Sequence, residues 1–236
     1  MIVYGRNPVR EALRGPRAVP RVWATERAAH EDWLSEAGPE PASGQEIERL
    51  SGSPDHQGVC AEVSDYEYAD PGELLASEDA VVVALDQVQD PQNLGAICRV
   101  AECAGAAGVV IGERRAAQVT AAVCRASVGA VEHLRVARVG NLADWLASAK
   151  QAGAWVYGAS PVPEAVPYDD PDYSGRVVLV LGGEGHGLRP RVAAACDRLV
   201  ALPMRGRIES LNVSAAAAVL LYEILHSGRA GVDKAT

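Results

Sequence analysis

A glycine-rich segment in the last third of the chain has the composition of a ligand-binding loop. Residues 182–187 are GGEGHG, so Glu184 is a single acidic side chain among four glycines. Glycine lets the backbone approach a ligand closely, and the free N–H groups of such a loop bind polar or anionic groups. The segment therefore indicates a binding site, with a tight structural turn as the alternative.

Two further segments carry amide, hydroxyl and guanidinium groups. Asn93 and Arg99 lie six residues apart in NLGAICR, and Ser210 and Asn212 lie in SLNVS. Amides and hydroxyls donate and accept hydrogen bonds, and a guanidinium stabilises negative charge that develops during a reaction. Local roles are also available, because Asn93 and Ser210 suit helix N-caps and Arg99 suits a surface charge. Three such segments in order along the chain favour one shared site.

The elements that position these segments alternate regularly from residue 80 onward. Apolar runs rich in β-branched residues predict strands at 80–85, 108–111, 134–139, 154–157, 177–181 and 199–202. Helices are predicted at 93–104, 119–126, 142–152, 190–195 and about 211–226. Continuous apolar strands separated by helices indicate an α/β domain whose mostly parallel sheet is covered by helices on both faces. Each polar segment then follows a strand end, at the edge where such proteins keep their sites.

The first 65 residues predict a separate, smaller α/β unit. Strands are expected at 2–4, 19–24 and 58–63, and helices at 7–13, 26–37 and 45–50, with Asn7 as the cap of the first helix. An acidic stretch that contains Pro71 and Gly72 follows. Because proline and glycine interrupt regular structure, we expect domains at 1–68 and 80–236, joined by a linker at 69–79.

The charge distribution allows a nucleic-acid partner although the net charge is −9. Residues 1–27 carry a net charge of +4, residues 28–79 one of −13, and residues 80–236 one of 0. The excess acid is therefore confined to one stretch. The arginines of the basic N-terminal segment could follow a phosphate backbone, or could form a solvated helix face: Arg6, Arg10, Arg14, Arg17 and Arg21.

Several classes of protein are excluded or disfavoured. No G-x-G-x-x-G follows the first strand of the larger domain, and no Walker loop occurs. The five cysteines form no C-x-x-C pair and the five histidines lack ligand spacing, so no metal site is predicted. No apolar run reaches the roughly 18 residues of a membrane span. The N-terminal sequence lacks a secretory pattern, and we expect a cytoplasmic protein.

Together these motifs resemble a known family of enzymes. N-x-G-x-x-x-R, GGEG-x-G and LPM-x-G-x-x-x-SLNVS are similar to the three signature motifs of the SpoU/TrmH class of SPOUT RNA 2′-O-methyltransferases. RASVGAVEHLRVARV also looks like that family, and the match covers residues 80–227. The opening YGRNPVREAL is similar to the N-terminal RNA substrate-binding domain of the 23S rRNA guanosine 2′-O-methyltransferase branch.

The resemblance implies a fold, a cofactor and an assembly. It implies a deep trefoil knot at the end of the larger domain, an exception to the rule that chains do not thread. It also implies bound S-adenosylmethionine and a homodimer with the active site at its interface. The segment 215–221 is apolar all the way round its helix, which is compatible with cover from a second chain.

Roles for individual residues follow from the same resemblance. The residues implied in catalysis are Asn93, Arg99, Glu184, Ser210 and Asn212. Those implied in contacting the cofactor are Gly182, Gly183, Gly185, Leu202, Met204 and Leu211. RNA contacts are expected from Arg6, Arg10, Arg114, Arg205 and Arg207.

Alternatives to methylation of a 23S rRNA guanosine stay open. Within the class, these are a tRNA 2′-O-methyltransferase and an rRNA methyltransferase that confers antibiotic resistance. From a different class, the chain could be a non-catalytic RNA-binding factor of ribosome assembly that kept the fold. The presence of all five implied catalytic residues disfavours this last alternative.

Overall fold

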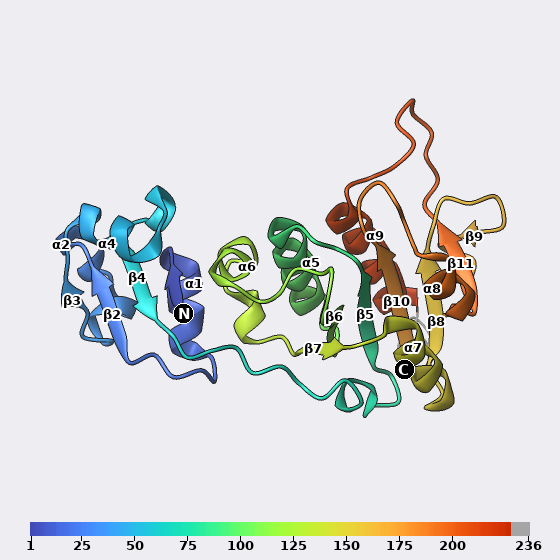
Figure 1. The fold of residues 1–236 in the computed structure, drawn as a ribbon, viewed down its shortest axis with the longest axis horizontal. Helices are drawn as coiled ribbons and strands as arrows, with labels where there is room; N and C mark the ends of the chain where they lie inside the picture. Colours follow the sequence, from blue (N-terminus) through green and yellow to red (C-terminus); the bar gives the residue numbers. More distant parts are fainter. Residues whose placement is uncertain (228–236) are drawn as a thin grey trace, which may run out of the picture.

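The larger part of the chain is built on a sheet in which neighbouring strands are parallel (Figure 1). The computed structural model describes residues 1–227. Across the sheet the strands are β7 (Val136–Val139), β6 (Gly108–Gly112), β5 (Val81–Asp86), β10 (Val177–Gly182), β8 (Trp155–Ala159), β11 (Arg198–Ala201) and β9 (Val166–Pro167). The predicted α/β class with a parallel sheet is confirmed.

Alternating side chains of the central strands divide the core between the two faces of the sheet. Val83 and Leu85 belong to the core on the side of α5 (Pro91–Ala104), α6 (Ala121–Ala126) and α9 (Val213–Ser227). Val82 and Ala84 belong to the core on the side of α7 (Leu142–Gln151) and α8 (Pro190–Ala195). Because side chains alternate across a strand, a strand that is apolar at every position is stable only with helices on both faces.

The order of the strands requires one connection near the end of the chain to pass over a strand. Strand β8 lies between β10 and β11, so the chain that leaves β10 must pass β8 before it forms β11. Helix α9 then returns to pack against α5 and β10. This topology is consistent with a trefoil knot. The knot itself stays a prediction from the family resemblance.

The N-terminal part is a smaller mixed sheet in the order β1 (Ile2–Tyr4), β4 (Val59–Glu62), β2 (Arg21–Ala24) and β3 (Glu40–Pro41). Strand β4 is antiparallel to β1 and to β2, and β2 is parallel to β3. The helices of this part are α1 (Arg6–Arg14), α2 (Glu26–Ala29), α3 (Asp32–Ser35) and α4 (Gly44–Ser51). Figure 1 shows this part at one end of the long axis, and the chain then runs along the larger sheet to reach β5.

Two predictions for the N-terminal helices are wrong. The single helix expected at 26–37 is two short helices, α2 and α3. The imidazole Nδ1 of His30 lies 2.6 Å from the carbonyl oxygen of Glu26, the oxygen that the backbone N–H of His30 would bond in a longer helix. Helix α1 begins at Arg6 after Gly5 (φ 92°), so Asn7 lies inside it rather than at its cap.

A buried ion pair joins the two parts of the chain. Arg17 Nε donates to Glu132 Oε2 at 2.8 Å, Arg17 Nη2 contacts Glu132 Oε1, and both side chains are almost fully buried. Burial disfavours the charged form of Arg17, but the hydrogen bond and the charge of Glu132 outweigh it and hold the pKa of Arg17 above its ordinary value. Arg17 therefore connects the domains and does not follow an RNA backbone.

A candidate active site at the carboxyl edge of the sheet

A cavity of about 490 Å³ opens where β8, β10 and β11 end. Most of its exposed lining is apolar, and its size suits a small organic molecule, since ligand pockets range over about 300–1,000 Å³. The six residues implied in cofactor contacts all line it, as do three of the implied catalytic residues, Glu184, Ser210 and Asn212. Segments that are far apart in the sequence therefore meet at one site.

The glycine-rich loop forms one wall of this cavity and folds tightly back on itself. The backbone N–H of Gly187 donates to the carbonyl of Gly183 at 3.1 Å. A side chain at position 182 would place its Cβ 2.2 Å from the carbonyl carbon of Gly187, and one at 183 would lie 2.4 Å from the carbonyl oxygen of Gln87. Only glycine fits these two positions, so the loop is built by close backbone packing.

Asp86 holds both ends of this loop. Its carbonyl accepts the backbone N–H of Gly183 at 2.8 Å, and its carboxylate accepts the backbone N–H and the Nε–H of Arg189 at 2.8 and 2.7 Å. Asp86 is only 1% exposed, although it ends an otherwise apolar strand. This role of Asp86 was not predicted from the sequence. The available signal was an acidic residue directly after five apolar positions, because a buried carboxylate needs dedicated partners.

An amide pair connects the first and third polar segments. Asn212 Nδ2 donates to Asn93 Oδ1 at 2.9 Å. Asn212 Oδ1 accepts the backbone N–H of Ser214 at 2.8 Å and its hydroxyl at 2.6 Å. Asn212 therefore caps α9 and Ser210 does not. This contact lets the start of α5 position the wall that α9 contributes to the cavity.

The prediction that Asn93 caps its helix is wrong, because Asp90 is the N-cap of α5. Asp90 Oδ1 accepts the backbone N–H of Gln92 at 2.8 Å, and Pro91 occupies the first helical position. Proline already has the backbone angle of a helix and lacks the N–H that would stay unpaired there, so the helix begins two residues earlier than predicted. Asn93 is thereby buried in the first turn and free to face Asn212.

Of the five residues implied in catalysis, Asn93 and Arg99 do not line the cavity. Arg99 is exposed on α5, six residues after Asn93, and it is not among the residues that line the cavity. Six helical residues correspond to about 240° of rotation, so Arg99 points to a different side of α5 than Asn93. Within residues 1–227, no hydrogen bond joins Asn93 to Glu184, whose side chain is exposed at the cavity.

The predicted RNA-contacting arginines lie in three places. Arg205 and Arg207 are exposed in the segment that leads from β11 to α9 and that carries the cavity residues Met204 and Glu209. Arg114 lines a second cavity of about 350 Å³ with Arg115, Arg189 and Arg191, at the carboxyl ends of β5 and β6. Arg6 and Arg10 lie on α1, where Arg6 pairs with Glu31 at 2.7 Å and Arg10 Nε is buried without a partner.

Residues 1–227 contain neither a candidate metal site nor a candidate membrane span. No three side chains of histidine, cysteine, aspartate or glutamate gather there as a metal site would require. In the same residues, no helix has the length and apolar composition of a membrane span.

Family models match both parts of the chain. The SpoU rRNA Methylase family matches residues 80–222, which are more than half of the protein. The model for RNA 2′-O ribose methyltransferase substrate binding matches residues 2–69. The chain belongs to the SpoU rRNA methylase family. The predicted resemblance is confirmed, and the protein is an RNA methyltransferase of the SpoU/TrmH class.

Relatives with similar sequences carry the same class of name. A TrmH family tRNA/rRNA methyltransferase of Bacillus subtilis, YacO, is 37% identical over 236 residues, which cover 94% of each chain. A tRNA/rRNA methyltransferase of Synechocystis is 35% identical over 249 residues. That match covers all of this chain but only 64% of the Synechocystis protein, so this chain spans less than two thirds of that relative.

Solved structures of SpoU methyltransferases have the same fold. AviRb from Streptomyces viridochromogenes, solved with AdoMet, superposes with a TM-score of 0.82 at 25% identity, covering 96% of this chain and 89% of that one. An AdoMet-bound rRNA methyltransferase from Sinorhizobium meliloti gives a TM-score of 0.80 at 26% identity, with 98% and 87% covered. The likeness extends over both parts of this SpoU-family chain.

Asp86→Ala is expected to destabilise this SpoU methylase, because it leaves the half-buried backbone N–H of Arg189 without an acceptor. The expected loss is about 2 kcal/mol of unfolding free energy, measured by urea denaturation. The matched control is Asp144→Ala, which removes an exposed ion pair with Arg191 and is expected to cost less than about 1 kcal/mol. Equal losses in the two variants would contradict the role assigned to Asp86.

Proposed function

We propose that this protein transfers a methyl group from S-adenosylmethionine to a ribose 2′-hydroxyl of RNA, and that a guanosine of 23S rRNA is the first substrate to test. The observation that carries the proposal is the single cavity that brings together the glycine loop, the 202–211 segment and Asn212. Residues 1–68 would bind the RNA, 69–79 would link the domains, and 80–236 would carry out the transfer, residues 228–236 lying outside the described part. An RNA substrate agrees with the cytoplasmic location expected from the sequence.

The cavity suits S-adenosylmethionine in size and in chemistry. The side chains of Leu202, Met204 and Leu211 offer apolar contact for an adenine ring, and the backbone of the loop around Gly182 and Gly183 offers polar groups. When bound, S-adenosylmethionine supplies an electrophilic methyl group on a sulfonium. The AdoMet-bound structures of AviRb and of the Sinorhizobium meliloti enzyme support this choice of donor.

The side chains at the mouth of the cavity suit the orientation of an RNA acceptor. Ser210 and Asn212 are exposed there and able to hydrogen-bond the ribose, and Asn93 holds Asn212 in place. Holding the 2′-hydroxyl in line with the methyl group supplies much of the acceleration, because the reactants then meet in one orientation. Glu184 would shape the loop from its edge.

Arg99 is the proposed cation for the developing alkoxide. A guanidinium stays protonated in proteins, so its role is to orient the neighbouring phosphate and to stabilise negative charge on the 2′-oxygen, while the hydroxyl proton passes to water. Because Arg99 lies outside the cavity of its own chain, we propose that it acts at the cavity of a second chain.

The outer face of α9 supports a homodimer. Ala215, Val219 and Tyr222 are exposed and follow one another at spacings of four and three residues, which places them on one side of the helix. Val219 is 42% exposed and Tyr222 is 46% exposed, and Ile208 nearby in the sequence is 75% exposed. Contiguous exposed apolar side chains mark interaction surfaces, and this one adjoins the cavity segment.

Replacing Arg99 by alanine is expected to abolish methylation while S-adenosylmethionine still binds. The loss of one stabilising donor typically lowers kcat by about 100-fold or more. Methylation is measured by transfer of a labelled methyl group to unmodified 23S rRNA and tRNA transcripts, and donor binding is measured by calorimetry. Arg135→Ala, which removes another exposed arginine of the same domain, is the control and is expected to keep full turnover.

The outcomes separate the alternatives. Near-normal turnover in the Arg99 variant would remove this residue from the mechanism. Methylation of tRNA but not of rRNA would replace the proposed substrate, and failure of the unaltered protein to bind the donor would favour a non-catalytic RNA-binding factor.

The double variant Arg205→Ala and Arg207→Ala is expected to bind RNA more weakly and with less dependence on salt. Each phosphate contact that is lost reduces the magnitude of the slope of log K against log salt by about 0.7–0.9. The magnitude should therefore fall by about 1.5 in the double variant. Affinity for S-adenosylmethionine should stay close to normal. Filter binding over a salt series measures the slope, and an unchanged slope would count against both arginines.

The double variant Val219→Glu and Tyr222→Glu is expected to be monomeric, because four buried carboxylates would make the proposed interface unstable. Sedimentation velocity should show two chains for the unaltered protein and one for the variant, which should also lose methylation. Trp155→Glu places a carboxylate at another exposed apolar residue, 51% exposed, and should stay dimeric. A fully active monomer would refute the shared site.

A further inference from the structure

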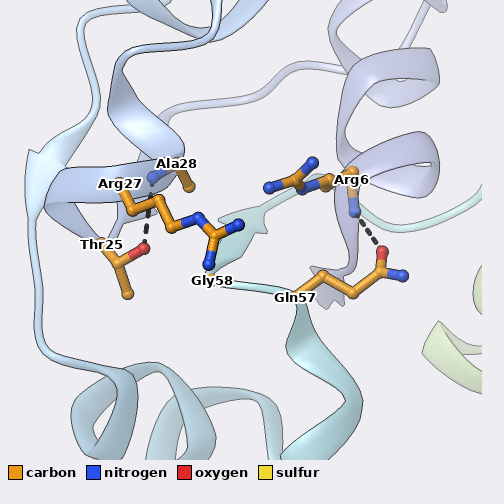
Figure 2. A pocket seen from close by; sticks show the side chains of 6 residues that line it. All are labelled: Arg6, Thr25, Arg27, Ala28, Gln57 and Gly58. Carbon is orange, nitrogen blue, oxygen red and sulfur yellow. Dashed lines mark hydrogen bonds between the residues drawn. The ribbon is translucent and has the colours of Figure 1, made fainter.

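A further cavity of about 450 Å³ lies in the N-terminal part, and the methyl-transfer site does not use it. Its walls come from the start of α1, the start of α2 and the turn before β4. The residues that line it are Arg6, Thr25, Arg27, Ala28, Gln57 and Gly58. Figure 2 shows the guanidinium groups of Arg6 and Arg27 pointing into the same space from opposite sides.

The walls of this cavity are held in place by local hydrogen bonds. Gln57 Oε1 accepts the backbone N–H of Arg6 at 3.0 Å, and Thr25 Oγ1 accepts the backbone N–H of Ala28 at 3.4 Å (Figure 2). Gly58 has a φ of +81°, and a Cβ at this position would lie 2.7 Å from Thr25 Oγ1. The cavity is therefore shaped before any ligand arrives, which lowers the entropy cost of binding.

The charges around the cavity are not balanced. Arg6 pairs with Glu31 at 2.7 Å. No hydrogen bond or ion pair of the Arg27 side chain is found within residues 1–227. Two guanidinium groups that face one space repel one another unless an anion lies between them, so the arrangement favours an anionic ligand.

A third guanidinium reaches the same region from the methyltransferase domain. A Cβ at Gly5 would lie 3.2 Å from Arg125 Nη1 and 3.3 Å from Gln57 Oε1, so Arg125 of α6 and Gln57 meet at the start of α1. Arg125, like Arg27, forms no ion pair with the described residues. The guanidinium groups of Arg6, Arg27 and Arg125 thus lie at this corner, where Arg6 pairs with Glu31.

We propose that this cavity binds a phosphodiester group of the RNA substrate, with Arg27 and Arg6 on the phosphate oxygens and Arg125 beside them. Arginine suits this ligand because its planar group donates two parallel hydrogen bonds to a phosphate. The inference rests on the proposed function, since it takes RNA as the substrate. In Figure 1 the N-terminal part lies at the far end of the long axis from β10 and α9, so this phosphate lies away from the methyl-transfer cavity of the same chain.

The test compares Arg27→Ala with Arg49→Ala, an exposed arginine on α4 that carries the same charge and lines no such cavity. The probe is an unmodified transcript of 23S rRNA, bound to the full chain between about 50 and about 200 mM KCl. Arg27→Ala is expected to weaken binding about tenfold at low salt and to lower the salt slope by about 0.7–0.9, while Arg49→Ala stays close to the unaltered protein. In methylation assays KM should rise with kcat unchanged, because the cavity is remote from the reacting atoms.

Arg27→Lys distinguishes a phosphate contact from a general effect of charge. It keeps the cation but not the paired donors, so the salt slope should return while the affinity recovers only in part. Each variant should have the circular dichroism spectrum and the urea midpoint of the unaltered protein. Weaker RNA binding then cannot be due to a folding defect.

Several results would overturn the inference. Equal RNA affinity and equal salt slope in Arg27→Ala and Arg49→Ala would do so, even if the protein methylates RNA as proposed. Tight binding of inorganic phosphate that is lost in Arg27→Ala, with RNA affinity unchanged, would assign the cavity to a small free anion instead. If no RNA is methylated but Arg27→Ala still weakens RNA binding, the proposed function fails and the phosphate site stands.

Discussion

The carboxylate of Asp86 is the interaction on which the site depends. A buried carboxylate is costly unless hydrogen bonds replace the water that it loses, and here the backbone and side chain of Arg189 supply them. Its carbonyl binds Gly183 at the other end of the same loop. One residue at the end of a central strand thus holds the loop from both sides. The loop can then consist mostly of glycine and still present a defined wall.

The rest of the cavity follows from packing between helices that are far apart in the sequence. Helix α9 lies against α5 because apolar residues on the same face of the sheet bury both helices. This packing brings Asn212 within 2.9 Å of Asn93. This hydrogen bond adds little stability beyond that of the apolar packing, but it sets the position of the segment that leads into α9. The wall at Leu211 and the loop at Gly182 therefore meet at one cavity.

Arginines in this acidic protein have two different uses, and burial separates them. Arg17 is enclosed with Glu132, so its charge is neutralised and it ties the N-terminal part to the methyltransferase part. Arg27, Arg205 and Arg207 stay accessible at cavities and loops. A net charge of −9 therefore says little about RNA binding, since the local field near a cluster of guanidinium groups decides how a phosphate is attracted.

The sequence by itself determined the fold class and the segments that follow strand ends at one edge of the sheet. Apolar strands that alternate with helices have one stable solution, a parallel sheet covered on both faces, and the motifs at 182–187 and 202–212 follow strand ends that must share one edge. The sequence also predicted most of the elements to within a few residues. It failed where local signals compete. Asp90 and Pro91 start α5 earlier than the predicted cap at Asn93. The imidazole of His30 contacts the carbonyl oxygen of Glu26, which a longer helix would use for its backbone hydrogen bond.

Only the tertiary structure decided which polar groups meet. Asp86 and Arg189 are about a hundred residues apart, as are Arg17 and Glu132, and neither pairing leaves a periodic signal in the sequence. The position of Arg99 was also decided by the tertiary structure. The motif places Arg99 with the site residues, but α5 directs it away from the cavity of its own chain. Such partners are set by how sheets and helices stack, because a side chain pairs with whatever group the packed backbone brings within reach.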